Sequence, residues 1–231
     1  NVQGNQHLVD LSQKFDVSTF VLISTDKAVN PAGVMGATKR ICELMITQAG
    51  LKTGKTYCAV RFGNVLGSSG SLIPLLMKQI QNGQPITITH PDMTRYFMLI
   101  PEAVSLVLRA ATLSDPGDIS VLRMGNPVKI VDIAKNLVTL MGKTEDECPI
   151  VFTGVRPGEK MFEELYIQGN EIETEDPDVL IVPKGESNAN LLEIDSCLSR
   201  IVEMALRNRE VSVSELHKVI ELSLGRPSPE E

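Results

Sequence analysis

The chain has 231 residues, of which 42% are hydrophobic and 22% are charged, and its formal net charge is −7. This length and composition predict a globular protein with a well-buried core, and the acidic balance argues against nucleic acid as a partner. No stretch approaches the ~20 apolar residues of a membrane-spanning helix. We therefore expect neither a membrane segment nor a signal peptide within this chain.

The four cysteines lie far apart in the sequence. Cys42, Cys58, Cys148 and Cys197 form no C-x-x-C pair and have no histidine nearby that would complete a metal site. We therefore expect reduced, buried thiols in a cytoplasmic protein, and no metal centre.

Amphipathic helices and buried strands alternate along most of the chain. In order, the spacing of apolar residues predicts a helix over 5–15, a strand over 20–23, a helix over 34–51, a strand over 57–62, a helix over 71–81, a strand over 86–88, a helix over 101–113, a strand over 119–124 and a helix over 130–141. The order is less regular after residue 150. There we expect a strand over 179–182, helices over 191–208 and 212–224, and a disordered end over 225–231.

This alternation indicates an α/β architecture with a parallel sheet. Ligands of such sheets collect at the carboxyl ends of the strands, so the loops after Ile23 and Phe62 are the places to expect a site. No G-x-G-x-x-G follows any predicted strand, and Gly67-Ser-Ser-Gly70 has a different spacing. Either the protein binds no dinucleotide, or the half that binds it lies upstream of Asn1.

Three residues of different chemistry follow the first predicted strand. Thr25, Asp26 and Lys27 offer a hydroxyl, a carboxyl and an amine. Side chains alternate faces within a strand, so these three can converge only where the chain leaves it, and Pro31 supports a turn there. By themselves the residues are also compatible with a solvated turn, in which Asp26 bonds locally and Lys27 extends into water.

The next predicted helix carries Met35 and Lys39, four residues apart and therefore on one face. Lys39 by itself would be an ordinary solvated lysine. Together with the preceding strand, the pair resembles the extended short-chain dehydrogenase/reductase superfamily, whose members carry Y-x-x-x-K at this place. Met35 stands at the tyrosine position. Asn1-Val-Gln-Gly4 resembles the N-x-x-G segment that opens the preceding helix of that superfamily.

Longer motifs narrow the resemblance. The triplet T-D-K with methionine in place of tyrosine is similar to the polysaccharide-biosynthesis (CapD-like) UDP-N-acetylglucosamine 4,6-dehydratases. Further matches are Arg61-Phe-Gly-Asn-Val-Leu-Gly67, Thr89-His-Pro-Asp-Met-Thr-Arg-Tyr-Phe-Met98 and Arg156-Pro-Gly-Glu-Lys160. The resemblance covers about residues 1–185. It implies the C-terminal part of a doubly wound, Rossmann-like parallel sheet with a smaller substrate-binding lobe.

The resemblance also implies a reaction. Such dehydratases oxidise C4 of the sugar with NAD, lose water across C5 and C6, and return the hydride to C6. Lys27 would be the base at C5, Asp26 the acid at O6, and Thr25 a hydrogen-bonding group near O4. Because Met35 cannot transfer a proton, a water molecule or Thr25 would have to carry the O4 proton.

Binding residues follow from the same motifs. For NAD, Lys39 would hold the ribose hydroxyls, and the other expected contacts are Met35, Phe62, Gly63 and Val65. For the UDP-sugar they are Asn64, Thr89, Arg95, Arg156 and Glu159, since guanidinium groups suit phosphates and a carboxylate can accept from a ribose hydroxyl. Both arginines have an ordinary alternative as turn or surface residues.

The expected organisation has three parts: residues 1–65 and 99–124 in the NAD domain, 66–98 and 125–185 in the substrate lobe, and 186–231 in a helical extension. A homo-oligomer is expected. Longer members of the family carry a membrane-spanning region upstream, which would anchor this part at the cytoplasmic side of the inner membrane. By itself, the chain is expected to bind NAD weakly.

Two other functions remain open. A UDP-sugar 4-epimerase would normally need the tyrosine that Met35 replaces. A non-catalytic binding module, or an inert fragment, is consistent with the missing glycine fingerprint.

Overall fold

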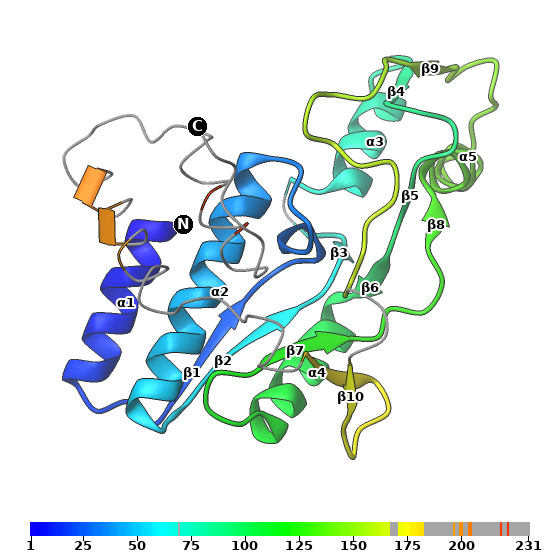
Figure 1. Ribbon diagram of the computed structural model, residues 1–231. Coiled ribbons are helices and arrows are strands. Elements are labelled where there is room, and N and C mark those ends of the chain that lie inside the picture. The colour runs from blue at the N-terminus through cyan, green and yellow to red at the C-terminus, as the bar shows by residue number, and fades with distance from the viewer. Residues whose placement is uncertain are drawn as a thin grey trace. The chain divides into compact units, whose positions relative to one another are not determined.

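The computed structural model describes residues 1–68, 70–166 and 171–182, together with residues 196, 199–200, 203–204, 218 and 221. It confirms the predicted α/β fold (Figure 1). The chain divides into two compact units. Unit 1 comprises residues 1–62, 107–123 and 164–231, and unit 2 comprises residues 63–106 and 124–163.

Unit 1 is built on a five-stranded sheet in the order β1-β2-β7-β11-β10. The strands β1 (Thr19–Ile23), β2 (Thr56–Arg61) and β7 (Ile119–Leu122) run parallel, as predicted. The strand β11 (Val179–Val182) pairs antiparallel with β7, and β10 (Ile172–Glu173) pairs antiparallel with β11. The sheet is therefore mixed, with its parallel strands on one side.

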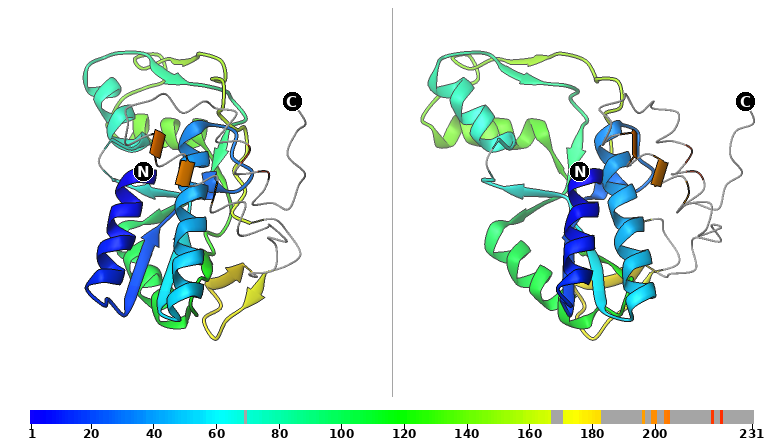
Figure 2. Two further views of the ribbon diagram at one scale, coloured as in Figure 1. Left: turned by 60° about the vertical axis from the view of Figure 1, so that its left-hand side comes forward. Right: turned by 90° about the vertical axis from the view of Figure 1, so that its left-hand side faces the viewer.

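Two helices, α1 (Val2–Lys14) and α2 (Val34–Thr53), cover one face of this sheet (Figure 2). Val9 of α1, Ile46 and Ala49 of α2 and Tyr57 of β2 share a buried cluster there. The part of α4 (Ile100–Leu113) that belongs to unit 1 lies on the other face (Figure 2). Covering both faces is what the continuous apolar run of β2 requires, and residues 57–61 are buried. The buried strand predicted over 20–23 is only partly buried, because β1 lies at the edge of the sheet, and Ile23 is 46% exposed.

Glycine lets α2 lie close to the sheet and then ends it. A Cβ atom at Gly50 would collide with the backbone of Tyr57 and Gly117. Gly54 adopts a left-handed backbone with φ 68°, and its N–H donates to the carbonyl of Gly50. The predicted end of this helix, near these two glycines, is therefore confirmed.

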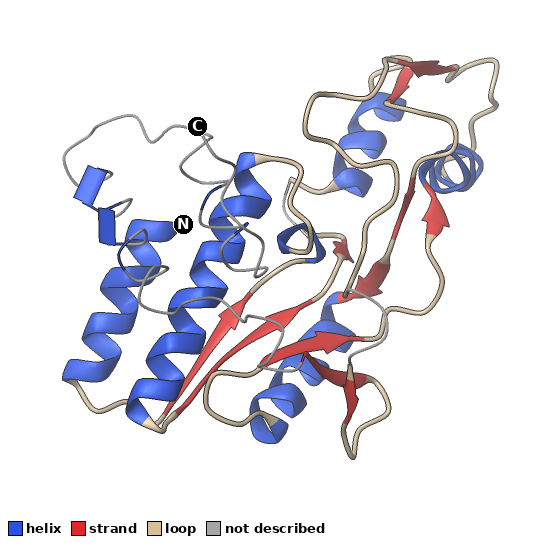
Figure 3. Cartoon of the chain, viewed as in Figure 1, coloured by secondary structure: helices blue, strands red, loops and turns tan. Residues whose placement is uncertain are grey.

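Unit 2 packs α3 (Leu72–Gln81) and α5 (Ile130–Leu140) against short strand pairs (Figure 3). The pairs are β3 (Asn64–Leu66) with β6 (Phe97–Leu99), β4 (Ile86–Ile88) with β9 (Ile150–Phe152), and β5 (Thr94–Arg95) with β8 (Val128–Lys129). The core is formed by the buried residues Leu76, Ile80, Ile86, Ile88, Met93, Ile130, Ala134, Val138 and Cys148.

Every helix and strand predicted before residue 142 has a counterpart, but the unit boundaries differ from the expected ones. Residues 63–65 and 99–106 belong to unit 2, because β3 pairs with β6 and β6 continues into α4. Residues 164–182 belong to unit 1, because β11 joins β7. The helices expected over 191–208 and 212–224 and the end over 225–231 lie outside the continuously described residues.

Within the described part of the chain, no helix has the length and apolar character needed to cross a membrane.

Candidate active site

The three residues Thr25, Asp26 and Lys27 form a tight turn directly after β1. Thr25 is the N-cap of a 3-10 helix, η1 (Asp26–Ala28), and its hydroxyl accepts from the N–H of Lys27 at 3.4 Å. Beside this turn, the N–H of Ser24 donates to Val60 O at 2.8 Å and that of Asp26 donates to Phe62 O at 3.1 Å. The triplet thus converges at the point where the chain leaves the strand, as the sequence predicted.

The carboxyl group of Asp26 is fully buried, so this is not a solvated turn. Its Oδ1 accepts from the Thr25 hydroxyl at 2.7 Å, from the Lys27 N–H at 2.9 Å and from Lys27 Nζ at 2.8 Å. Its Oδ2 is also buried and has no hydrogen-bond partner among the described residues. A buried polar atom without a partner is costly, and it marks a place where a proton or an outside hydroxyl group would be stabilised.

The first turns of α2 lie against this turn. A Cβ atom at Gly36 would collide with the carbonyl of Lys27, so glycine permits the close approach. Met35, next to it, is exposed. Lys39 Nζ donates to the carbonyl of Ile23 at 2.9 Å, at the carboxyl end of β1. The structure therefore brings the helix that carries Met35 and Lys39 to the strand end that carries the triplet.

A second buried carboxylate, Glu43, lies one turn further along α2 and is 0% exposed. It accepts from Ser24 Oγ at 2.5 Å, from Arg61 Nε and Nη2 at 2.7 Å each, and from Arg40 Nη1 at 3.1 Å. Burial raises the pKa of Glu43, but the charges and hydrogen bonds of Arg61, with Arg40 and Ser24, outweigh it. The pKa of Glu43 therefore lies below its ordinary value.

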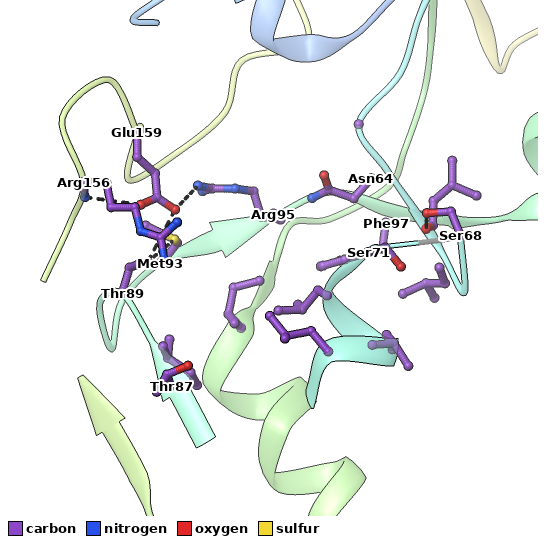
Figure 4. Close-up of a pocket in the computed structure, with 18 of the residues that line it drawn as sticks. Asn64, Ser68, Ser71, Thr87, Thr89, Met93, Arg95, Phe97, Arg156 and Glu159 are labelled. Carbon is purple, nitrogen blue, oxygen red and sulfur yellow. Dashed lines mark hydrogen bonds and ion pairs between the residues drawn. The ribbon is translucent and has the colours of Figure 1, made fainter. Parts of the chain in front are cut away.

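Unit 2 contains a pocket of about 850 Å³ (Figure 4). Its volume falls within the range of small-molecule sites. Seven of the predicted site residues line it, namely Gly63, Asn64, Val65, Thr89, Arg95, Arg156 and Glu159. Gly63 and Val65, which were expected at the cofactor, are thus grouped with the residues expected at the substrate. Phe62 belongs to unit 1 and does not line this pocket.

The two arginines of the pocket differ in their surroundings (Figure 4). The Arg95 guanidinium is buried and donates to Thr94 O at 2.7 Å, Lys160 O at 2.9 Å and Met161 O at 3.1 Å. It also lies 3.6 Å from Glu159 Oε1. Arg156 is exposed, and its side chain forms no ion pair with any described residue, while its N–H donates to Glu159 Oε2 at 3.3 Å.

Several residues of these sites were not predicted. Ser68, Ser71 and Phe97 also line the pocket, and the hydroxyl oxygen of Ser71 is buried without a partner among the described residues. Phe97 lies in β6 and the two serines follow β3, and both strands are too short to show a hydrophobic periodicity in the sequence. One feature of the sequence could have indicated the ion pair of Glu43 with Arg61. Each is a single charged residue within or at the end of an apolar run.

The three cysteines that the structure describes offer no nucleophile here. Cys42, Cys58 and Cys148 are free and buried, and burial raises the pKa of Cys42 to about 11. Among the described residues, no group of three or more His, Cys, Asp or Glu side chains is arranged to hold a metal ion.

Known proteins resemble the chain over most of its length. CapD, a capsular polysaccharide biosynthesis protein of Staphylococcus aureus, is 57% identical over 173 residues, which are 74% of this chain and 29% of CapD. A UDP-glucose 4-epimerase of Rickettsia canadensis is 38% identical over 180 residues, which are 76% of this chain and 51% of that enzyme. The chain thus spans less than a third of one relative and about half of the other.

A solved structure also resembles the chain. The crystal structure of Pen from Bacillus thuringiensis superposes with a TM-score of 0.71 at 32% identity, and the match covers 79% of this chain and 57% of that one. Residues 1–184 match the family described as polysaccharide biosynthesis protein. The predicted family is therefore confirmed, and the chain belongs to the polysaccharide biosynthesis protein family.

Proposed function

We propose that the chain carries the catalytic turn and the nucleotide-sugar pocket of an NAD-dependent UDP-N-acetylglucosamine 4,6-dehydratase. The observation that carries this proposal is the buried carboxyl of Asp26, which has three donors on Oδ1 and, among the described residues, none on Oδ2. It lies at the carboxyl end of a parallel strand, where α/β proteins bind their ligands.

In this proposal Asp26 is the general acid. Its Oδ1 is fully used by donors, so a proton on the carboxyl group would sit on Oδ2, where no described residue competes for it. A proton at that atom can be given to O6 of the sugar as the C6–O6 bond breaks, which releases water.

Lys27 is the base at C5. Its Nζ shares a 2.8 Å hydrogen bond with Asp26 Oδ1. Transfer of one proton from the ammonium to Oδ1, followed by its relocation to Oδ2, gives a neutral amine and a carboxylic acid together. These are the two forms that removing the C5 proton and protonating O6 require. One proton shift within the pair thus prepares both groups.

Thr25 takes the place of the missing tyrosine at O4. Its hydroxyl donates to Asp26 Oδ1 at 2.7 Å, so its oxygen is left to accept from the O4–H group. The O4 proton would pass by way of the Thr25 hydroxyl to water, because the Asp26 carboxyl already holds the proton that Lys27 gave. Met35 cannot do this, and a water molecule at the same position is the alternative carrier.

The residues that the structure describes fit one end of NAD. Lys39 places a cation at the carboxyl end of β1 and Met35 an exposed apolar side chain on the same helix face, so these two would contact the nicotinamide ribose. No glycine-rich fingerprint for the pyrophosphate is present in the sequence. NAD, when bound, supplies the hydride acceptor for C4 and the hydride donor for C6.

The pocket of unit 2 suits a nucleoside diphosphate. Arg156, whose charge is not committed to a described carboxylate, would contact the phosphates, and Glu159 would accept from a ribose hydroxyl. Asn64 and Thr89 offer further polar contacts on the pocket wall. Arg95 would have to exchange its carbonyl partners to reach a phosphate, so we assign the direct contact to Arg156.

The test uses the full-length gene product with UDP-N-acetylglucosamine in heavy water. We expect a 4-keto-6-deoxy sugar with deuterium at C5. We also expect Lys27→Ala to abolish its formation without unfolding the protein. Wild-type turnover by Lys27→Ala would remove that residue from the mechanism.

A UDP-sugar 4-epimerase is the second candidate, favoured by the similarity to the Rickettsia enzyme. Recovery of only the C4 epimer from the same incubation would favour the epimerase over the dehydratase. A preparation that binds UDP in the pocket but forms neither product would instead indicate a non-catalytic binding module.

A further inference from the structure

The cluster around Glu43 joins three segments of unit 1. Ser24 follows β1, Arg61 ends β2, and Arg40 lies on α2 with Glu43 itself. All four hydrogen bonds end on the two oxygens of one carboxylate, at 2.5 to 3.1 Å. Such bonds are directional and fix the relative position of the three segments more tightly than apolar packing would.

Stability alone gives a weak reason for this cluster. A buried ion pair recovers little net free energy, and apolar residues of similar volume often serve as well. The neighbours of Glu43 on α2 include the buried Ile41, Cys42 and Leu44, so an apolar side chain would fit this stretch of the helix. We therefore expect the charged cluster to have a second role, which is to fix one particular geometry.

The geometry that it fixes is that of the strand end before the triplet. Ser24, bonded to Glu43, is the residue before Thr25. Lys39, four residues before Glu43 and on the same helix face, holds the carbonyl of Ile23. Arg61 precedes Phe62, whose carbonyl accepts from the N–H of Asp26. Both backbone segments that locate Asp26 are thus bonded to α2 or to Glu43.

We propose that Glu43, acting through Ser24, is a positioning residue for Thr25, Asp26 and Lys27. Its side chain is 0% exposed, so it does not touch a substrate. It holds the strand end so that the donors of the turn converge on Asp26 Oδ1 and leave Oδ2 for the reaction. The kinetic consequence rests on the proposed dehydratase function, whereas the ordering of the turn does not.

Ser24→Ala is the sharpest test, because it removes only the hydrogen bond between Ser24 and Glu43 and leaves both arginines paired. Ser120→Ala is the matched control. Ser120 lies on β7 of the same sheet, is fully buried, and loses one hydrogen bond of 2.9 Å, to Ser114. Both variants are made in the full-length gene product and compared with the wild type.

Two readouts are measured. Hydrogen exchange at the amides of residues 25–28 should accelerate about tenfold in Ser24→Ala and stay unchanged in Ser120→Ala. The kcat for the UDP-sugar should fall about tenfold or more in Ser24→Ala, with KM within about twofold of the wild type. A general loss of stability would lower the activity of both variants alike, and it would not lower kcat while leaving KM unchanged.

Unchanged exchange at residues 25–28 in Ser24→Ala overturns the proposal, whatever happens to kcat. Faster exchange with a kcat equal to that of Ser120→Ala overturns it as well. If the wild type forms no 4-keto sugar, the dehydratase function fails, and faster exchange in Ser24→Ala alone still supports the ordering of the turn by Glu43.

Discussion

Two fully buried carboxylates of unit 1 differ in how their oxygens are used. In the cluster at Glu43, both oxygens accept hydrogen bonds, and two guanidinium groups balance the charge. In the turn at Asp26, three donors meet Oδ1, and Oδ2 has no partner among the described residues. A carboxylate that is fully paired is committed to the fold. A carboxyl group with one oxygen left over is available for chemistry.

The same distinction separates the two arginines of unit 2. Arg95 is buried, and its guanidinium donates to three backbone carbonyls and lies near two carboxylates. Arg156 is exposed at the wall of the same pocket. Both residues are arginines, and each lies in a motif that resembles the family. Their surroundings distinguish the residue that shapes the pocket from the one that can meet a ligand.

The largest expected effect is on turnover in Asp26→Asn. Asparagine keeps the size of the side chain and an oxygen for the donors, but it has no acidic proton to give. We expect kcat to fall on the order of 10³-fold, the typical contribution of a general acid. Formation of the 4-keto sugar measures the loss, and a urea midpoint close to that of the wild type would show that the fold is kept. A kcat within tenfold of the wild type would contradict the role of Asp26.

Next in size is the effect of Glu43→Gln on stability. The substitution leaves the buried Arg61 without the carboxylate that it pairs with, which typically costs about 3–5 kcal/mol. Urea unfolding followed by circular dichroism measures the change. Asp26→Asn is the control, because the side chain of Lys27 is 27% exposed and can be solvated when its partner is removed. If both variants lost the same free energy of unfolding, the two carboxylates would not differ in their contribution to stability.

The sequence predicted the position of Asp26 but not the state of its oxygens. A polar triplet after an apolar run was enough to locate the turn at the end of β1, since strand periodicity allows no earlier convergence. Glu43 was not predicted as a site residue, because its partners Ser24 and Arg61 are 19 and 18 residues away in the sequence. The family motifs named seven residues of the unit 2 pocket, but no local pattern revealed that the guanidinium of Arg95 is occupied.

A smaller effect should separate Arg156 from Arg95. Arg156→Ala should raise the Kd for UDP about tenfold, through the loss of one phosphate contact, with no change in stability. Arg95→Ala should lower the stability of the protein, because the carbonyls of Thr94, Lys160 and Met161 lose the hydrogen bonds from its guanidinium. Calorimetry with UDP and thermal unfolding of both variants provide the comparison. A weaker affinity for UDP in Arg95→Ala alone would reverse the assignment.

The smallest effect near neutral pH is the pH dependence of the Glu43 cluster. Because the pKa of Glu43 is held below its ordinary value of 4.5, mainly by Arg61 against the opposing effect of burial, the folded state favours the ionised carboxylate. The stabilisation is therefore fully present above the pKa of the unfolded chain and is lost as the pH falls through the folded pKa. The difference in unfolding free energy between the wild type and Glu43→Gln should stay constant from about pH 8 to about pH 6 and narrow only below about pH 4.5. A difference that narrowed as the pH rose would mean that Glu43 is protonated in the folded protein. In that case its two oxygens would not be equivalent acceptors, and the contrast with Asp26 would disappear.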